Sequence, residues 1–240
     1  MAIKNTPPDW AIDELSAYLD TFRTNQFATF ANKGQAMKDL IQIDSMFWRL
    51  LNGAINPRPF YPMNFMLRAH SAYRASVCSI MGGQLYEAQA LLRLCLEHAA
   101  YGFYIGADTG RLERWLHRSD SEDNRKVVRK EFHNDKLREH IRCHAPVMSS
   151  QFDQLYNSLI EFGAHPNEQG YSLHSNVSEQ DNNIHFQTIY LQDNGGRLDR
   201  SMKIAGQVGL WALHLMQLIY RERYELLGLR SGLEEVRQRF

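Results

Sequence analysis

The sequence predicts a mainly α fold: a helical bundle of five or six main helices with a small irregular or β-hairpin insertion near residues 170–192. Three observations favour this class. Apolar residues recur at helical spacing through several long segments, glycines and prolines separate those segments, and one short stretch alternates instead. The chain has 240 residues with 44% hydrophobic content, which is enough for one sizeable core. We therefore predict a single helical domain over residues 1–240.

The N-terminal helices are expected within residues 9–52. Asp9 follows two prolines and can cap a first helix that ends near Asn32. Gly34 separates this helix from a second one, which the proline-rich run at 56–62 ends.

The core helices are expected at residues 63–106, 149–163 and 198–227, where apolar residues follow helical spacing. Gly82 and Gly83 interrupt the first range, so it should form two antiparallel helices joined by a tight turn. The last range holds two glycines that permit close approach of a neighbouring helix.

The remaining segments are more polar. Residues 109–144 are rich in both charges and poor in aliphatic side chains, which is typical of exposed helix around a polar turn. An insertion over 165–197 contains the weak alternation that predicts a β-hairpin at 170–192. A short helix over 232–239 is expected after the last core helix.

Charge and cysteine content limit the classes of function. The 27 basic and 27 acidic residues give zero formal charge, so no global field indicates nucleic acid or an anionic membrane. Arginines outnumber lysines 20 to 7, which favours planar contacts with carboxylate or phosphate. Three scattered cysteines do not form a disulfide framework. No stretch is long and apolar enough to be a leader or a membrane span, and we predict a cytoplasmic protein.

The helix expected over residues 85–105 is apolar on almost every side, yet it carries charge in its middle. At 100° per residue its polar residues fall on one stripe. The stripe consists of Tyr86, Gln89, Arg93, Glu97 and Tyr104. Charged side chains inside a bundle are rarely buried without a partner. The stripe is therefore either a structural polar network or a site, and the sequence leaves both interpretations open.

As a site, the stripe offers Arg93 as the group that binds an anion and Glu97 as the group that orients it or acts as a base. As a structural pair, the same two residues would fix how the helices pack. Removing one partner of a fully buried pair would then cost about 3–5 kcal/mol. Arg68, on the preceding helix, can approach Glu97 if the two helices pack together.

His165 lies in the sequence EFGAHPNEQG, at the end of one helix and before a proline. A turn at this place can present the imidazole to a groove, and histidine carries protons near neutral pH. Asn167 adds a polar side chain to the same corner. The catalytic candidates are thus Arg93, Glu97 and His165. The alternative is that His165 only interacts with the helix C-terminus.

Metal-binding and nucleotide-binding motifs are missing from the sequence. It contains no Glu-x-x-His, no His-Glu-x-x-His, no Cys-x-x-Cys and no glycine-rich phosphate loop. Glu161 and His165 have the spacing of a ligand pair, but one such pair occurs easily by chance. We predict no metal and no cofactor.

Two segments, MGGQLYEAQALLRLCLEHAAYGFYI and YNSLIEFGAHPN, resemble bacterial helical-bundle proteins of unknown function related to HEPN domains. The resemblance covers roughly residues 65–170. It implies that Arg93 and Glu97 pack near the corner at His165, and that the protein is a homodimer. Some HEPN relatives cleave RNA, and their signature is Arg, four to six residues, then His. That spacing occurs here three times, about as often as chance predicts, so it does not identify a nuclease.

Three functions follow as hypotheses. The first is a HEPN-like homodimer that acts as a binding or interaction module. The second is an enzyme of a defence or toxin system that acts on RNA or a nucleotide through the three catalytic candidates. In that case Arg68 and Asn167, with the rest of the polar stripe, would bind the substrate. The third is a purely structural bundle in which Arg93 and Glu97 pair only with each other.

Overall fold

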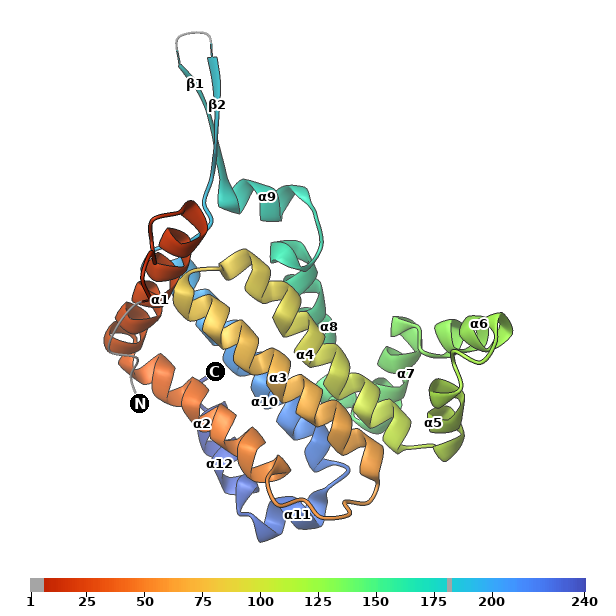
Figure 1. Cartoon of the computed structure of the whole chain (residues 1–240). Helices are drawn as coiled ribbons and strands as arrows, with labels where there is room; N and C mark the ends of the chain where they lie inside the picture. Colours follow the sequence, from red (N-terminus) through yellow and green to blue (C-terminus); the bar gives the residue numbers. More distant parts are fainter. Residues whose placement is uncertain (1–6, 181–182) are drawn as a thin grey trace.

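A computed structural model describes residues 7–180 and 183–240, and it confirms the mainly α class. The described residues form six helices of at least 14 residues, six shorter helices, one π-helical turn and one two-stranded sheet (Figure 1). The long helices are α1 (Glu14–Asn32), α2 (Gly34–Leu51), α3 (Phe60–Gly82), α4 (Leu85–Gly106), α8 (Pro146–Leu159) and α10 (Gly196–Gln217).

Helix α1 begins later than the sequence predicts. The cap is Asp13, whose Oδ1 accepts a hydrogen bond from the backbone N–H of Ser16 at 2.9 Å. Asp9, the predicted cap, lies before the helix with a left-handed φ of 65°. The prediction of a helix from residue 9 is wrong because the segment folds back, and the Trp10 indole donates to Asp20 at 3.1 Å.

The centre of the bundle is built from α3, α4 and α10. Gly83 ends α3 with a φ of 95°, and α4 returns antiparallel to it, as the two glycines predict. Helix α10 crosses behind this hairpin in Figure 1. A Cβ at Gly209 would lie only 2.7 Å from atoms of Ile43 and Tyr73, so this glycine allows α10 to approach its neighbours closely.

Helix α10 ends at Gln217 and does not continue to residue 227. A turn follows, and α11 (Arg221–Leu226) and α12 (Leu229–Arg237) complete the chain. The turn lets the Tyr224 hydroxyl reach back and donate to the carbonyl of Leu213 at 2.7 Å. The predicted single helix is wrong because the apolar pattern continues past the turn into α11, where Tyr224 is also buried.

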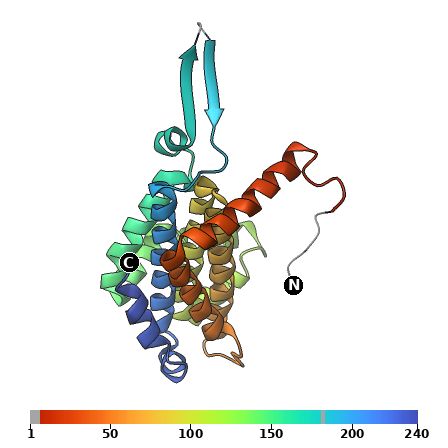
Figure 2. The ribbon, with the colours of Figure 1, turned by 90° about the vertical axis from the view of Figure 1, so that its left-hand side faces the viewer.

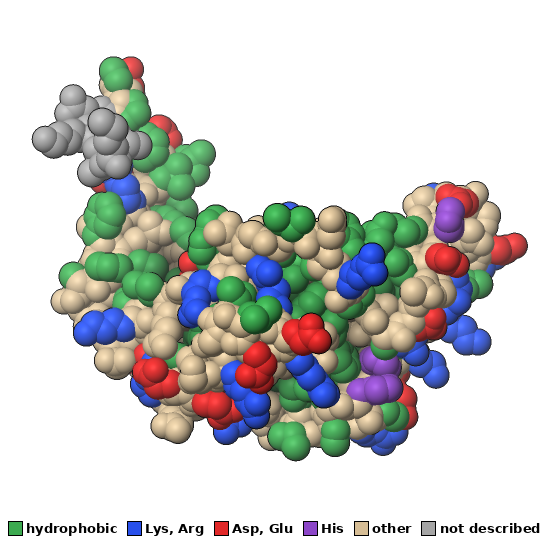
Figure 3. All heavy atoms as spheres, turned by 90° about the horizontal axis from the view of Figure 1, so that it is seen from below, with side chains coloured by type: hydrophobic (Ala, Val, Ile, Leu, Met, Phe, Trp, Pro, Cys, Tyr) green, Lys and Arg blue, Asp and Glu red, His purple; other side chains and the backbone are tan. Residues whose placement is uncertain are grey.

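The polar segment after α4 forms three short helices, which we call the arm: α5 (Thr109–Leu116), α6 (Glu122–Glu131) and α7 (Asn134–His144). The arm extends from one side of the bundle in Figure 1 and carries dense charge in the space-filling view of Figure 3. A separate apolar cluster holds it to α3 and α4. The cluster consists of Phe65, Tyr104, Ile105, Val128, Phe132 and Leu137.

The insertion contains less β structure than predicted. Strand β1 (Ser175–Gln180) pairs antiparallel with β2 (Asn183–Thr188), and the hairpin stands away from the bundle (Figure 1). The segment before it is α9 (Glu168–His174), a helix where the alternating pattern predicts a strand. Asn167 decides this difference, because its side chain caps the helix by accepting from the Gly170 N–H at 2.8 Å.

Candidate functional site

The predicted pair Arg93 and Glu97 lies on α4 at the edge of the core. Arg93 Nε donates to Glu97 Oε1 at 2.8 Å, and the two side chains are 29% and 31% exposed. The pair is therefore neither sealed in the bundle nor free in solvent. Burial would lower the pKa of Arg93, but the hydrogen bond and charge of Glu97 outweigh it and raise that pKa.

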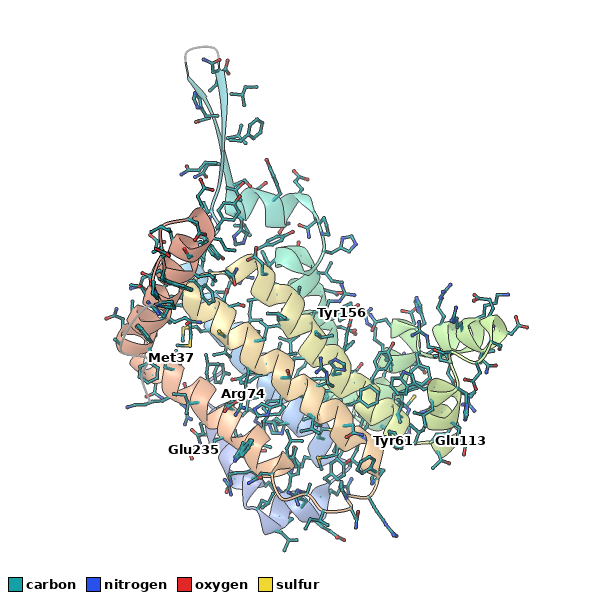
Figure 4. The ribbon with its side chains drawn as sticks, in the orientation of Figure 1. Met37, Tyr61, Arg74, Glu113, Tyr156 and Glu235 are labelled. Atoms are coloured by element: carbon teal, nitrogen blue, oxygen red, sulfur yellow. The ribbon has the colours of Figure 1, made fainter. Side chains whose placement is uncertain are left out.

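Tyr156, from α8, completes this contact (Figure 4). Its hydroxyl donates to Glu97 Oε1 at 3.2 Å, and the Arg93 guanidinium carbon lies 5.2 Å from its ring centroid. Burial, and then the charge of Glu97, raise the pKa of the Tyr156 hydroxyl, so it stays a donor near neutral pH. We call these three residues the Arg93–Glu97–Tyr156 cluster.

Arg138, from α7, extends the cluster to the arm. Its guanidinium carbon lies 5.1 Å from the Tyr156 ring centroid, and its Nε lies 3.0 Å from Oδ1 of Asp153 on α8. Arg93 and Arg138 thus both contact one aromatic ring. Together with Arg138 the cluster links α4, α7 and α8. Glu97 accepts hydrogen bonds from Arg93 and Tyr156, whereas the buried Arg138 Nε and Asp153 Oδ1 form an ion pair without a hydrogen bond. The partly exposed guanidinium groups of Arg93 and Arg138 and the carboxylate of Glu97 remain accessible to a ligand.

The other members of the polar stripe lie apart from this cluster. The Gln89 amide is buried and donates to the Leu85 carbonyl at 3.0 Å, and Tyr86 packs edge-on against His174. At the far end of α4, the Tyr104 ring lies 3.9 Å from the Arg111 guanidinium carbon. The stripe is continuous along the helix, but its residues contact three different neighbours and do not converge.

Arg68 is exposed on α3, and in the described part of the chain no ion pair joins it to Glu97. Its charge acts on His98 instead. Burial is the largest cause of the lowered pKa of His98, and Arg68 lowers that pKa further. The imidazole of His98 also packs 6.1 Å from the Phe65 ring.

His165 follows a π-helical turn, η1 (Ile160–Ala164), at the end of α8. Its ring is exposed, and Nδ1 lies 3.1 Å from the carbonyl oxygen of Pro166. Among the described residues no hydrogen bond, ion pair or ring contact joins His165 to Arg93 or Glu97. The structure brings the arginine and the glutamate together, and their joint catalytic role with His165 stays a prediction.

Asn167 has a structural role in this corner. Its Nδ2 donates to the carbonyls of Ile160 at 2.8 Å and His165 at 2.9 Å, and its Oδ1 caps α9. All the polar atoms of the Asn167 amide are thus used to hold the turn. Tyr156 and Arg138 were not predicted as part of this site, because Tyr156 follows the apolar spacing of its helix and Arg138 lies in a segment that is charged throughout.

The larger hollows of the surface lie elsewhere. One groove of about 650 Å³ runs between α1, α2 and α3, and another of about 620 Å³ runs between α8, α10 and the end of the chain. A third hollow of about 450 Å³ lies on the arm. None of these three is lined by the predicted site residues.

Within residues 7–180 and 183–240, no three histidine, cysteine, aspartate or glutamate side chains gather closely enough to hold a metal ion. In the same part of the chain, no helix has the length and apolar character needed to cross a membrane. Comparisons of the chain with models of protein families, with curated proteins and with solved structures found no match.

Proposed function

We propose that this protein is an interaction module that works as a homodimer, and that two copies pair through α1 and the groove beside it. The observation that carries the proposal is the exposure of α1. The structure describes all 19 residues of this helix, and only Thr29 is buried. In Figure 2 the first half of α1 extends away from the bundle, and in this half Tyr18 and Phe22 contact the end of α3 and the turn after it.

Apolar side chains cover much of this exposed helix. Leu15, Phe27 and Phe30 are 67%, 68% and 58% exposed, which is unusual for large apolar residues in a helix of a soluble protein. The groove of about 650 Å³ lies directly against Phe27 and Phe30 and continues over α2 and α3. Its apolar lining also includes Met37, Leu40, Ile41, Tyr73, Val77 and Met81.

The charged groups in this groove are paired, so it can be covered without leaving an isolated charge. Asp44 receives two hydrogen bonds from Arg74, at 2.6 and 2.9 Å, and contacts His70 Nε2 at 2.7 Å. Burial alone would raise the pKa of Asp44, but Arg74 and His70 together hold it well below its usual range. The carboxylate therefore stays ionised and paired.

The occupant we propose for this face is a second copy of the chain. In a two-fold dimer the same patch of both copies forms the contact, so an apolar patch without an isolated charge can cover the equivalent patch of a second copy. Here Phe27 and Phe30 of α1 belong to the lining of the groove and add exposed apolar surface to the patch. Zero net charge means that no overall repulsion opposes the pairing.

The test is the molar mass in solution, measured by light scattering coupled to size-exclusion chromatography. We expect a dimer for the native chain and a monomer for the double variant Phe27→Asp, Phe30→Asp, because each aspartate would place a charge in the apolar contact. The matched control is Phe186→Asp on β2, where the phenylalanine is 71% exposed but does not line the groove.

All of the substituted side chains are exposed, so the variants should keep the native circular dichroism spectrum. A monomeric native chain at 100 µM protein (roughly the concentration at which a contact of ~5 kcal/mol would be populated) would contradict the proposal. Dissociation by Phe186→Asp, with no effect of the double variant, would place the contact on the hairpin instead.

A second candidate function, binding of RNA, is favoured by one observation on the arm. The hollow of about 450 Å³ is lined by Lys126, Arg129, Lys130, Lys136, His133 and Asp135. Lys126 pairs with Asp123 at 3.3 Å, but no ion pair of the described residues includes Arg129, Lys130 or Lys136. Such a cationic surface suits the phosphate groups of a nucleic acid.

Binding of a fluorescein-labelled single-stranded RNA, followed by anisotropy, tests this second function. We expect weaker binding at higher salt and about tenfold weaker binding for Arg129→Glu, Lys130→Glu. The control Arg221→Glu changes an exposed arginine on α11, at the far end of the molecule. The same samples on a gel test cleavage: equal cleavage by the native chain, Arg93→Ala and His165→Ala would remove those residues from a catalytic role.

A further inference from the structure

The groove between α8 and α10 has a composition unlike that of the other hollows. Arg237 and Phe240, at the end of the chain, line one side of it. Its volume of about 620 Å³ lies in the range of small-molecule sites. Its lining comes mainly from α8 and α10, and in Figure 2 the green α8 and the blue α10 run beside each other. The lining on α10 extends from Arg200 to Gln217, a span of about 26 Å at 1.5 Å per residue.

One end of the groove is cationic. Arg200 and Lys203 lie one turn apart near the start of α10, opposite Ser158 of α8. Within the described residues, neither cation takes part in an ion pair, and the Arg200 guanidinium carbon lies 4.4 Å from the Phe162 ring centroid. The lining has one more cation, Arg237, and that one is paired with Glu234 at 2.8 Å. None of the described lining residues is acidic.

Beyond these two cations the floor of the groove is apolar. It includes Met148, Leu155, Ile204, Leu210, Trp211, Leu218 and Phe240. The Trp211 indole N–H is already used, because it donates to the Met148 carbonyl at 3.0 Å. Burial lowers the pKa of His214, so this lining imidazole is neutral near pH 7 and adds no charge to the floor. The lining also includes four glutamines, Gln151, Gln154, Gln207 and Gln217.

We infer that this groove binds a molecule with a single acyl chain and an anionic head group. The head group, a carboxylate or a phosphate, would lie between Arg200 and Lys203, and the chain would follow the apolar floor toward Leu218. A groove that is cationic at one end and apolar along the rest has the polarity of such a ligand. A neutral lipid would leave both cations without a partner, and a short anion would leave the apolar floor exposed.

The primary experiment is isothermal titration calorimetry of the full-length protein with decanoate and with decyl phosphate, each below its micellar concentration. We expect one site per chain, and a Kd that falls about fourfold for each methylene added from octanoate to decanoate. Decanamide, which has the same chain but no charge, should bind at least tenfold more weakly. Tighter binding of decyl phosphate than of decanoate would identify the phosphate as the preferred head group.

Two variants locate the site. Lys203→Glu should weaken decanoate binding at least tenfold, because it reverses the charge next to the head group. Its matched control is Lys38→Glu, another exposed lysine, on α2. Leu155→Trp should also weaken binding, because the indole would occupy the space of the acyl chain. Leu155 is only partly buried, and this variant keeps the surface apolar, so it should fold.

Several results would overturn the proposal. One is the absence of binding heat with both ligands. Another is a Kd that does not depend on chain length, which would mean that the apolar floor is not used. A third is an equal effect of Lys203→Glu and Lys38→Glu. If Lys203→Glu changes the molar mass of the protein, the groove is a contact between chains, and the ligand proposal is wrong. The dimer test uses a different face and is independent of all these results.

Discussion

The Arg93–Glu97 pair shows why the position of a charged residue on a helix does not decide its energetic role. Helical spacing places both residues on one stripe of α4, and the sequence predicts that much. Their exposure, near 30% for each side chain, depends on Tyr156 of α8, which lies far along the chain. Water reaches both groups, so the interaction is screened and should be much weaker than that of a sealed pair.

We therefore expect Glu97→Ala to lower the free energy of unfolding by about 1 kcal/mol, with about 0.5 kcal/mol of coupling to Arg93→Ala in a double-mutant cycle. Urea unfolding followed by circular dichroism measures both values. The control is Glu139→Ala, which breaks a more exposed pair with Arg142 and should lower the free energy of unfolding less than Glu97→Ala does. A loss of 3 kcal/mol or more for Glu97→Ala would instead indicate a sealed structural pair.

His140 shows a residue-scale effect that the sequence does not reveal. It lies on the exposed-looking arm, yet the imidazole is buried against Phe103 and Tyr104, and its Nε2 has no hydrogen-bond partner in the described structure. Burial, with the nearby charges of His144 and Arg111, lowers its pKa to about 4. The folded protein therefore resists protonation of this side chain.

The sign of the pH dependence follows from this lowered pKa. In the unfolded chain His140 takes up a proton as the pH falls below about 6.5, while in the folded protein it stays neutral until about 4. The contribution of the neutral His140 to the free energy of unfolding is therefore fully present above pH 6.5. It is lost progressively as the pH falls from 6.5 to about 4. We expect the free energy of unfolding to fall by about 1 kcal/mol less in His140→Phe than in the native chain when the pH is lowered from 7.5 to 5.0. Urea unfolding at the two pH values measures this difference. The role of His140 would be contradicted if the native chain and His140→Phe lost equal free energy of unfolding over this pH range. It would also be contradicted if His185→Phe, on the exposed β2, reduced the loss as much as His140→Phe does.

At the scale of elements, the sequence predicts those helix ends that depend on residues close along the chain. It fails for elements whose ends depend on contacts with distant residues. The break at Gly82 and Gly83 is confirmed because the turn needs residues that tolerate a positive φ. The strand expected at Tyr171 is wrong because a local cap at Asn167 makes that segment helical. The end of α10 is missed because the chain after it is buried by residues of other helices.

The corner after α8 depends on one glycine. Gly163 has a φ of 152°, and a Cβ there would lie 2.6 Å from the backbone oxygen of Tyr86. We expect Gly163→Ala to lower the free energy of unfolding by about 2 kcal/mol, from backbone strain together with this clash. Gly34→Ala is the matched control, because a Cβ there meets nothing within 4 Å. Equal stability of the two variants in urea unfolding would show that the corner can rearrange.

At the scale of the whole molecule, the mainly α class can be predicted from composition and spacing, but the open faces cannot. Phe27 and Phe30 follow the same helical pattern as the buried residues of α2, and nothing in that pattern reveals that they are exposed. Exposure depends on which helices pack together and on where α1 leaves the bundle. The candidate grooves were therefore missed, although every apolar residue that lines them was visible in the sequence.

The proposed dimer makes a prediction about the stability of the whole molecule. If folding and pairing are linked, the midpoint of thermal unfolding rises with protein concentration, by ~1–2 °C for each tenfold increase in a dimer of this size. Calorimetric scans of the native chain over two decades of concentration measure this rise. The double variant Phe27→Asp, Phe30→Asp should unfold at one temperature throughout, while Phe186→Asp should keep the native dependence. A midpoint of the native chain that is constant over this range would mean that α1 is not held by a second copy, and the face that it forms with α2 and α3 would then require a different occupant.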